Sequence, residues 1–160
     1  MTGGFTNDLL KGKRALVTGG GTGLGKAIGR RYLELGADLV ICGRRAEALD
    51  ATAREFEQAF GRKVGTISCD IRNADSVEAM FDRIWSSGPL DILVNNAAGN
   101  FIAQSHRLSS RAIDAVLNTC LHGTAYCTIA AGRRWIDGGH PGVVLSILTL
   151  SALHGAAFTM

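Results

Sequence analysis

The chain lacks several features that define whole classes of proteins. It has no run of five or more basic residues, and its formal net charge of +3 is scattered along the sequence. We therefore expect no nucleic-acid partner, because such surfaces gather Lys and Arg into a block. It also has no internal repeat, low-complexity segment or linker. Its 160 residues predict a single domain spanning positions 1–160.

Long apolar segments are missing as well. No apolar run reaches the roughly 18 residues that a membrane span needs, and positions 1–13 contain no apolar core of a signal peptide. We expect no membrane partner and, by default, a cytoplasmic location.

The four cysteines lack the spacing of a metal or redox site. Cys42, Cys69, Cys120 and Cys127 contain no Cys-x-x-Cys pair and have no ligand spacing with the four histidines. Reduced thiols and no bound metal are the expectation.

A glycine-rich stretch is the most informative feature that is present. Thr18–Gly25 follows the strand-like run Arg14–Val17 and opens a helix at Leu24. A strand, a glycine turn and a helix N-terminus bring backbone N–H groups to a phosphate, and side chains there would obstruct the approach. The alternative is a flexible turn. The predicted cofactor-binding residues are Gly19, Gly21, Thr22, Gly23, Leu24 and Gly25.

Strand and helix patterns alternate along the chain. Strands are predicted at 14–17, 38–42, 64–68, 90–94 and 142–148, and helical stripes include Leu49, Ala53, Phe56 and Phe60, then Val77, Met80, Phe81 and Ile84. A longer helical region with Ser109 as a candidate cap closes at 138–141. The pattern predicts an α/β fold with a doubly wound parallel sheet in the order 3-2-1-4-5, and a ligand at the carboxyl ends of strands one and four.

Two motifs carry a family resemblance. The T-G-x-x-x-G-x-G spacing of Thr18–Gly25 and the block Asn95–Phe101 resemble the short-chain dehydrogenase/reductase superfamily, and the longer second block is similar to its 2,4-dienoyl-CoA reductase branch. The resemblance implies a Rossmann-type oxidoreductase, acting on an acyl-CoA-type substrate in fatty-acid metabolism and homo-oligomeric at full length. Members of the family continue with strands six and seven, so the chain is expected to be truncated before them. One sheet edge and the helix face of Leu121, Ala125, Ile129 and Ile136 would then be exposed.

Cofactor choice is predicted where the second strand ends. Cys42-Gly-Arg-Arg45 has no carboxylate that would repel a 2′-phosphate, and Arg44 and Arg45 could hold one. NADP(H) is therefore favoured over NAD(H), although both arginines could instead be solvated residues that open the next helix. By resemblance, Asp70 and Ile71 contact adenine; the competing interpretation of Asp70 is an ordinary aspartate before a helix.

The second block is expected to line the cofactor through Asn96, Ala97, Ala98 and Gly99, although turn asparagines commonly satisfy neighbouring backbone groups instead. The remaining roles are implied by the resemblance. Asn100 would help to hold the thioester carbonyl, Phe101 and Ser109 would line the acyl-CoA site, and Arg72 would meet CoA phosphates.

The chain departs from the family pattern at three catalytic positions. Thr149 occupies the position of the family's usual serine. Ser151 occupies the position at which one group of dienoyl-CoA reductases has its catalytic tyrosine. Cys120 replaces the helix asparagine, and the nearby His122 is interpreted as structural. No Tyr-x-x-x-Lys occurs before Met160. The alternatives are therefore an alcohol or carbonyl dehydrogenase of another substrate and a non-catalytic nucleotide-binding fragment.

Overall fold

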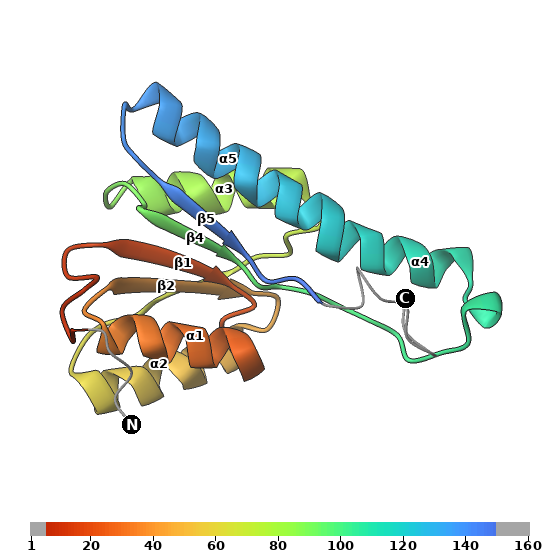
Figure 1. The fold of residues 1–160 in the computed structure, drawn as a ribbon, viewed down its shortest axis with the longest axis horizontal. Helices are drawn as coiled ribbons and strands as arrows, with labels where there is room; N and C mark the ends of the chain where they lie inside the picture. Colours follow the sequence, from red (N-terminus) through yellow and green to blue (C-terminus); the bar gives the residue numbers. More distant parts are fainter. Residues whose placement is uncertain (1–5, 150–160) are drawn as a thin grey trace.

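The computed structural model describes residues 6–149, and at its centre is a five-stranded parallel sheet (Figure 1). The strand order is β3-β2-β1-β4-β5, as predicted, and every neighbouring pair is parallel. The strands are β1 (Arg14–Thr18), β2 (Asp38–Gly43), β3 (Gly65–Ser68), β4 (Ile92–Asn95) and β5 (Val143–Ser146). Parallel strands need crossover connections, and here each crossover contains a helix.

Helices cover both faces of the sheet (Figure 1). α1 (Gly23–Glu34) and α2 (Ala46–Phe60) lie on one face, while α3 (Ala74–Trp85) and α5 (Thr124–Asp137) lie on the other. Side chains alternate along β1, so Ala15 and Val17 pack toward α1 and α2 and Leu16 packs toward α3 and α5. Both faces are therefore apolar, which a doubly covered parallel sheet requires.

The predicted helical stripes form the two halves of the core. Phe56 of α2 and Phe81 of α3 are fully buried on opposite sides of the sheet. Leu49 is buried beside Phe56, whereas Ala53 and Phe60 are partly buried at the edge of the same cluster.

The longer helical region predicted after residue 108 consists of two α-helices joined by a π-helical segment. Ser109 caps α4 (Ser110–Leu117), with its Oγ accepting a hydrogen bond from the Ala112 N–H at 3.2 Å. The helix then continues as a π-helical segment (Asn118–Gly123) before α5 begins. Hydrophobic periodicity does not reveal the extra residue in this turn, because the altered stretch is only six residues long.

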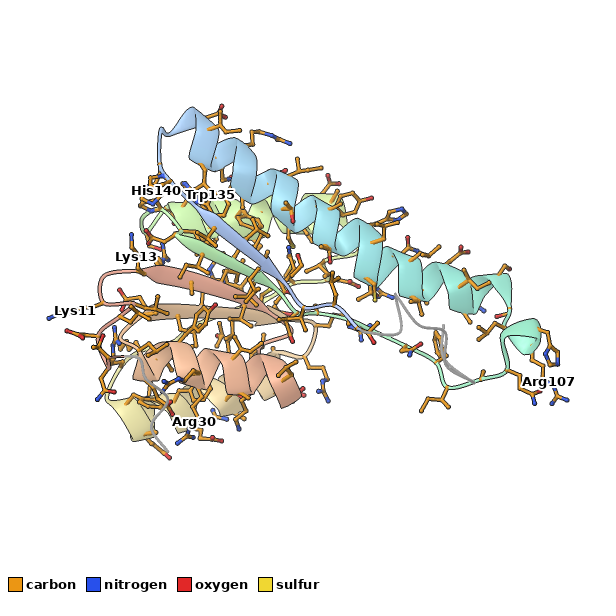
Figure 2. The ribbon with its side chains drawn as sticks, in the orientation of Figure 1. Lys11, Lys13, Arg30, Arg107, Trp135 and His140 are labelled. Atoms are coloured by element: carbon orange, nitrogen blue, oxygen red, sulfur yellow. The ribbon has the colours of Figure 1, made fainter. Side chains whose placement is uncertain are left out.

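α4 extends beyond the sheet, and no residue of it is buried (Figure 1). A short 3-10 helix, η1 (Ser105–Arg107), precedes it. We call residues 100–117 the arm. Figure 2 shows Arg107 at its far end, remote from Lys13, Trp135 and His140 at the amino ends of the strands.

The amino ends of the strands are closed by packing and ion pairs. Trp135 Nε1 donates a hydrogen bond to the Leu90 carbonyl at 2.5 Å, and Asp91 accepts bonds from the Arg14 N–H at 2.9 Å and from Lys13 Nζ at 3.1 Å. This leaves the carboxyl ends of the strands as the end of the sheet that can receive a ligand.

Apolar side chains remain exposed along β5 and the outer face of the π segment and α5. Val143 is 62% exposed, and Leu121, Ile129 and Ile136 are 58%, 56% and 82% exposed, while Ala125 is half-buried. Within residues 6–149, no helix combines the length and apolar character that crossing a membrane would require.

Candidate functional site

The glycine-rich turn between β1 and α1 is shaped by close backbone packing. Gly19 has a φ of +67°, and a Cβ there would lie 3.1 Å from the Ala97 Cα. At Gly25 a Cβ would collide with the Gly19 carbonyl and lie 2.5 Å from Asn96 Nδ2. Gly23 has open space around it, but its φ of +55° strains any residue with a side chain. Each of these three positions therefore favours glycine for a physical reason of its own.

The N-terminus of α1 is open toward a ligand. Thr22 is its N-cap, yet its side chain makes no capping hydrogen bond, and the first turn contains no acidic residue. Unpaired backbone N–H groups and the helix dipole together favour an anion at this position.

The turns after β1 and β4 are joined by hydrogen bonds. Thr18 Oγ1 accepts bonds from the N–H groups of Asn96 and Ala97, both at 3.0 Å. Asn95 is buried, and its Nδ2 donates to Thr128 Oγ1 at 2.9 Å. Asparagines of the second block therefore do satisfy structural hydrogen bonds, and Asn96 in addition lines the pocket described next.

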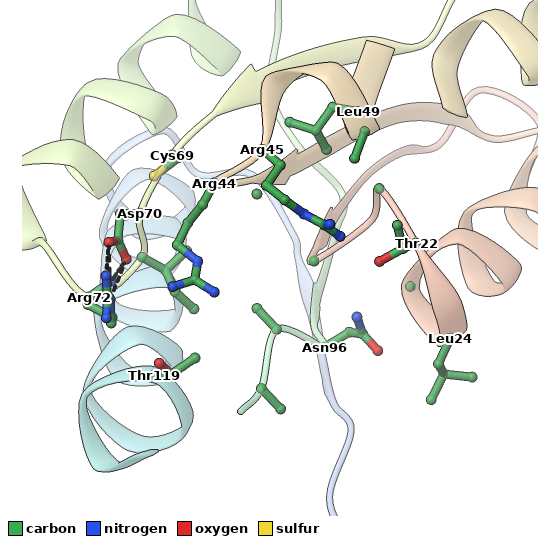
Figure 3. Close-up of a pocket in the computed structure, with 18 residues that line it drawn as sticks. Thr22, Leu24, Arg44, Arg45, Leu49, Cys69, Asp70, Arg72, Asn96 and Thr119 are labelled. Atoms are coloured by element: carbon green, nitrogen blue, oxygen red, sulfur yellow. Dashed lines mark hydrogen bonds and ion pairs between the residues drawn. The ribbon is translucent and has the colours of Figure 1, made fainter. Parts of the chain in front are cut away.

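A pocket of about 340 Å³ opens at the carboxyl ends of β1, β2, β3 and β4 (Figure 3). This volume lies within the range of small-molecule sites. It brings together most of the predicted cofactor-binding residues: Gly19, Gly21, Thr22, Leu24, Gly25, Arg44, Arg45, Asp70, Ile71, Asn96, Ala97 and Ala98. The predicted residues Gly23 and Gly99 are not part of its lining, whereas Arg72 is.

Five lining residues were missed by the sequence reasoning: Gly43, Ala48, Leu49, Cys69 and Thr119. Gly43 and Cys69 directly adjoin predicted residues, so strand-end position could have found them. Ala48 and Leu49 come from the first turns of α2. Thr119 comes from the π segment, and no signal in the sequence placed it at the pocket.

Three guanidinium groups reach the same pocket, those of Arg44, Arg45 and Arg72. Arg72 is paired with Asp70, its Nε lying 2.9 Å and its NH2 2.5 Å from the carboxylate oxygens (Figure 3). The hydrogen bond from the Arg72 side chain lowers the pKa of Asp70, partly opposed by burial and assisted by the nearby charge of Arg44. Asp70 therefore stays ionised, and its negative charge is neutralised by Arg72.

Of the predicted substrate residues only Arg72 lines the pocket, and the predicted catalytic residues within 6–149 lie elsewhere. Asn100 and Phe101 are at the start of the arm and Ser109 caps α4, and none of these three lines the pocket. Thr149 follows the end of β5 by three residues, and Ser151 lies outside the described residues. Their roles stay predictions.

The sequence profile of the short-chain dehydrogenase family matches residues 13–159. The chain belongs to this family. Its members are oxidoreductases that use NAD(H) or NADP(H) as cofactors.

Two relatives of the chain are named after the 2,4-dienoyl-CoA reductase branch, which the Asn95–Phe101 block resembles. It is 43% identical over 152 residues to a protein of Caenorhabditis elegans named probable 2,4-dienoyl-CoA reductase 3, covering 93% of this chain and 49% of the relative. It is 38% identical over 136 residues to a probable 2,4-dienoyl-CoA reductase of Bacillus subtilis, covering 84% of this chain and 53% of the relative. The chain thus spans about half the length of the curated relatives that it matches.

The fold is also found in solved structures. A short chain dehydrogenase from Bacillus anthracis superimposes with a TM-score of 0.89 at 37% identity, covering 94% of this chain and 60% of that one. The Rossmann-type arrangement of sheet and helices is therefore that of the family.

Proposed function

We propose that the chain carries the cofactor site of an NADPH-dependent reductase that acts on an enoyl- or 2,4-dienoyl-CoA thioester. The observation that carries this proposal is the continuity of the site. The pocket runs from the arginines after β2 to Ala98, and Asn100 and Phe101 follow only two and three residues later. The names of the relatives support the substrate class.

NADP(H) is favoured by the charges at the adenosine end of the pocket. Arg44 and Arg45 line it, and guanidinium groups bind phosphate well because they present several donors in one plane. Asp70 would repel a 2′-phosphate if it stood alone, but Arg72 neutralises it within the same pocket. The pyrophosphate would lie against the open N-terminus of α1, near Thr22 and Gly25.

The bound cofactor would supply a hydride to the conjugated thioester. Negative charge would develop on the thioester oxygen, and the resulting dienolate would then take up a proton. Asn100 is suited to donate a hydrogen bond to that oxygen. Its Oδ1 accepts the Phe101 N–H at 2.8 Å, which fixes the amide and leaves Nδ2 as the donor. Phe101 is 44% exposed, so its ring offers apolar surface that an acyl chain could cover.

The other predicted substrate residues keep narrower roles in this proposal. Arg72 would contact a CoA phosphate with the part of its guanidinium not bound to Asp70, and Ser109 would border the acyl site beside α4. Thr149 and Ser151 would supply hydroxyl groups after β5. We also propose that the full-length protein forms a homo-oligomer, which would cover the exposed apolar residues of α5.

Turnover of a dienoyl-CoA tests the proposal directly. The natural protein, purified at full length, would be mixed with NADPH and a 2,4-dienoyl-CoA, and NADPH consumption followed with and without the thioester. We expect consumption only with the conjugated thioester, and more slowly with NADH. Consumption with a ketone or aldehyde instead would assign another substrate class, and NADPH binding without any consumption would support a non-catalytic nucleotide-binding protein.

A further inference from the structure

The π segment touches the candidate site with two adjacent residues. Thr119 lines the pocket, on the same side as Asp70 and Arg72 (Figure 3). Cys120, the next residue, donates a hydrogen bond from Sγ to the Gly99 carbonyl at 3.4 Å. One turn of helix therefore contacts both the cofactor pocket and the loop that leads to Asn100.

These two contacts are made from a π turn. A π turn contains an extra residue, so its side chains are redistributed around the axis relative to an α-helix. Thr119 is held in place by its own Oγ1, which donates to the Ala115 carbonyl at 3.0 Å. Gly123 fixes the other end of the segment, because a Cβ there would lie 2.7 Å from the side chain of Ile71, itself a pocket residue. The segment is thus seated on the pocket wall at both ends.

The loop that Cys120 contacts has little support of its own. Residues 96–104 form no helix or strand, and Gly99 and Asn100 are exposed. The bond between Phe101 N–H and Asn100 Oδ1 orients the amide of Asn100 but is local, since it joins neighbouring residues. The Cys120–Gly99 bond instead ties this loop to a different element, one residue before Asn100.

We propose that Cys120 is a positioning residue, which sets the place of Asn100 by holding the Gly99 carbonyl, and that Thr119 makes this placement respond to the dinucleotide. The inference rests on the proposed function, because Asn100 acts there on the substrate. Binding at the adenosine end of the pocket contacts Thr119 and stabilises the π segment. The segment then holds Gly99 more firmly, so the arm is set for the substrate once the cofactor is in place.

Hydrogen exchange of the loop tests the inference without relying on turnover. The probe is 2′,5′-ADP, which occupies only the adenosine end, and the measurement is amide exchange in residues 98–103 of the full-length protein. The variants are Cys120→Ala, which removes the donor, and Cys120→Ser, which restores one. Leu121→Ala is the matched control, because Leu121 belongs to the same π segment but is 58% exposed.

We expect 2′,5′-ADP to slow loop exchange by about two-fold or more in the wild type, in Cys120→Ser and in Leu121→Ala, but not in Cys120→Ala. The affinity for 2′,5′-ADP should be the same in the wild type, Cys120→Ser and Leu121→Ala, and should fall by no more than about two-fold in Cys120→Ala, because the coupling is reciprocal. With a dienoyl-CoA, Cys120→Ala should lower kcat by about ten-fold at an unchanged KM for NADPH, since a small misplacement of a substrate-positioning group is costly.

The outcomes separate this inference from the proposed function. Identical exchange in Cys120→Ala and the wild type overturns the positioning role, even if the protein reduces a dienoyl-CoA. The expected exchange pattern without any dienoyl-CoA turnover supports the positioning role and contradicts the proposed substrate. No effect of 2′,5′-ADP on the wild-type loop overturns the link between Thr119 and Cys120.

Discussion

Asn96 donates two hydrogen bonds to Thr18, one from its backbone and one from its side chain. The Thr18 hydroxyl accepts the backbone N–H of Asn96 at 3.0 Å, and the Asn96 side-chain amide donates to the Thr18 carbonyl at 2.9 Å. This pair joins the turn after β1 to the turn after β4, and both turns contribute residues to the pocket lining. The two glycines Gly19 and Gly25 pack against the same asparagine.

Thr18→Val should therefore damage both stability and binding. Valine has nearly the same shape, but it leaves the N–H groups of Asn96 and Ala97 without their acceptor at a buried position. We expect a loss of about 1–3 kcal/mol in the free energy of unfolding, measured by urea denaturation, and weaker NADPH binding. Thr66→Val is the control, because the Thr66 hydroxyl donates to exposed Asp50, and it should change the free energy by less than about 0.5 kcal/mol. Equal losses in both variants would contradict the importance of the Thr18–Asn96 link.

Gly25→Ala should disrupt the turn at which the proposed cofactor would bind. Its Cβ would meet the Gly19 carbonyl and Asn96, which are backbone and a bonded side chain that cannot easily move. We expect NADPH affinity to fall by about ten-fold or more, roughly the effect of losing one charge-assisted hydrogen bond, in a fluorescence titration. Gly132→Ala in α5 has open space and should be neutral or stabilising, because alanine favours helix. Unchanged affinity in Gly25→Ala would show that the turn adapts.

Arg44→Asp should change the preference between the two dinucleotides. The substitution places a negative charge where the proposed 2′-phosphate would lie, so NADPH should lose far more affinity than NADH. Titration of both cofactors measures the ratio. Lys63→Asp makes the same change of charge at an exposed position outside the pocket lining and should leave the ratio unaltered. Equal losses for the two cofactors would remove Arg44 from recognition of the 2′-phosphate.

We expect the protein to lose stability in acid as Asp91 becomes protonated. Burial by itself raises the pKa of this carboxyl group, but the hydrogen bonds from the Arg14 N–H and Lys13 outweigh it and hold the pKa below its ordinary value of 3.8. Because the folded-state pKa is the lower one, the stabilisation is complete above the ordinary value and is lost as pH falls through the folded-state pKa. Urea midpoints across this range should fall more steeply for the wild type than for Asp91→Asn. Asp137→Asn, at an exposed position, controls for the change in net charge.

The four thiols should differ sharply in reactivity. Cys120 is exposed, whereas Cys42, Cys69 and Cys127 are buried, and burial raises the pKa of Cys69 to about 11 and of Cys127 to about 12. Since the thiolate is the reactive form, we expect a single fast-reacting thiol per 160-residue chain with a chromogenic disulfide reagent. Cys120→Ser should abolish the fast phase, and denaturant should expose the other three. A fast phase that survives in Cys120→Ser would mean that a buried cysteine opens readily.

Local signals in the sequence were enough to predict the sheet order and most of the pocket. Short apolar runs predicted the strands, helical spacing predicted the stripes around Phe56 and Phe81, and the glycines after β1 predicted the turn. The carboxyl ends of parallel strands meet at one edge, so residues that follow strands, such as Arg44 and Asp70, could be assigned to one site from strand order and position in the chain.

The contacts between segments were decided only by the tertiary structure. The π segment follows no periodicity that separates it from its flanking helices, so Thr119 could not be placed at the pocket. Nor could the sequence show that Thr18 bonds to Asn96, or that Cys120 bonds to Gly99, because these partners lie 78 and 21 positions apart. The sequence by itself determined the elements and the strand order, since these depend on local patterning and chain connectivity. The particular bonds around the pocket depend on how packed elements meet, which is set by the whole fold.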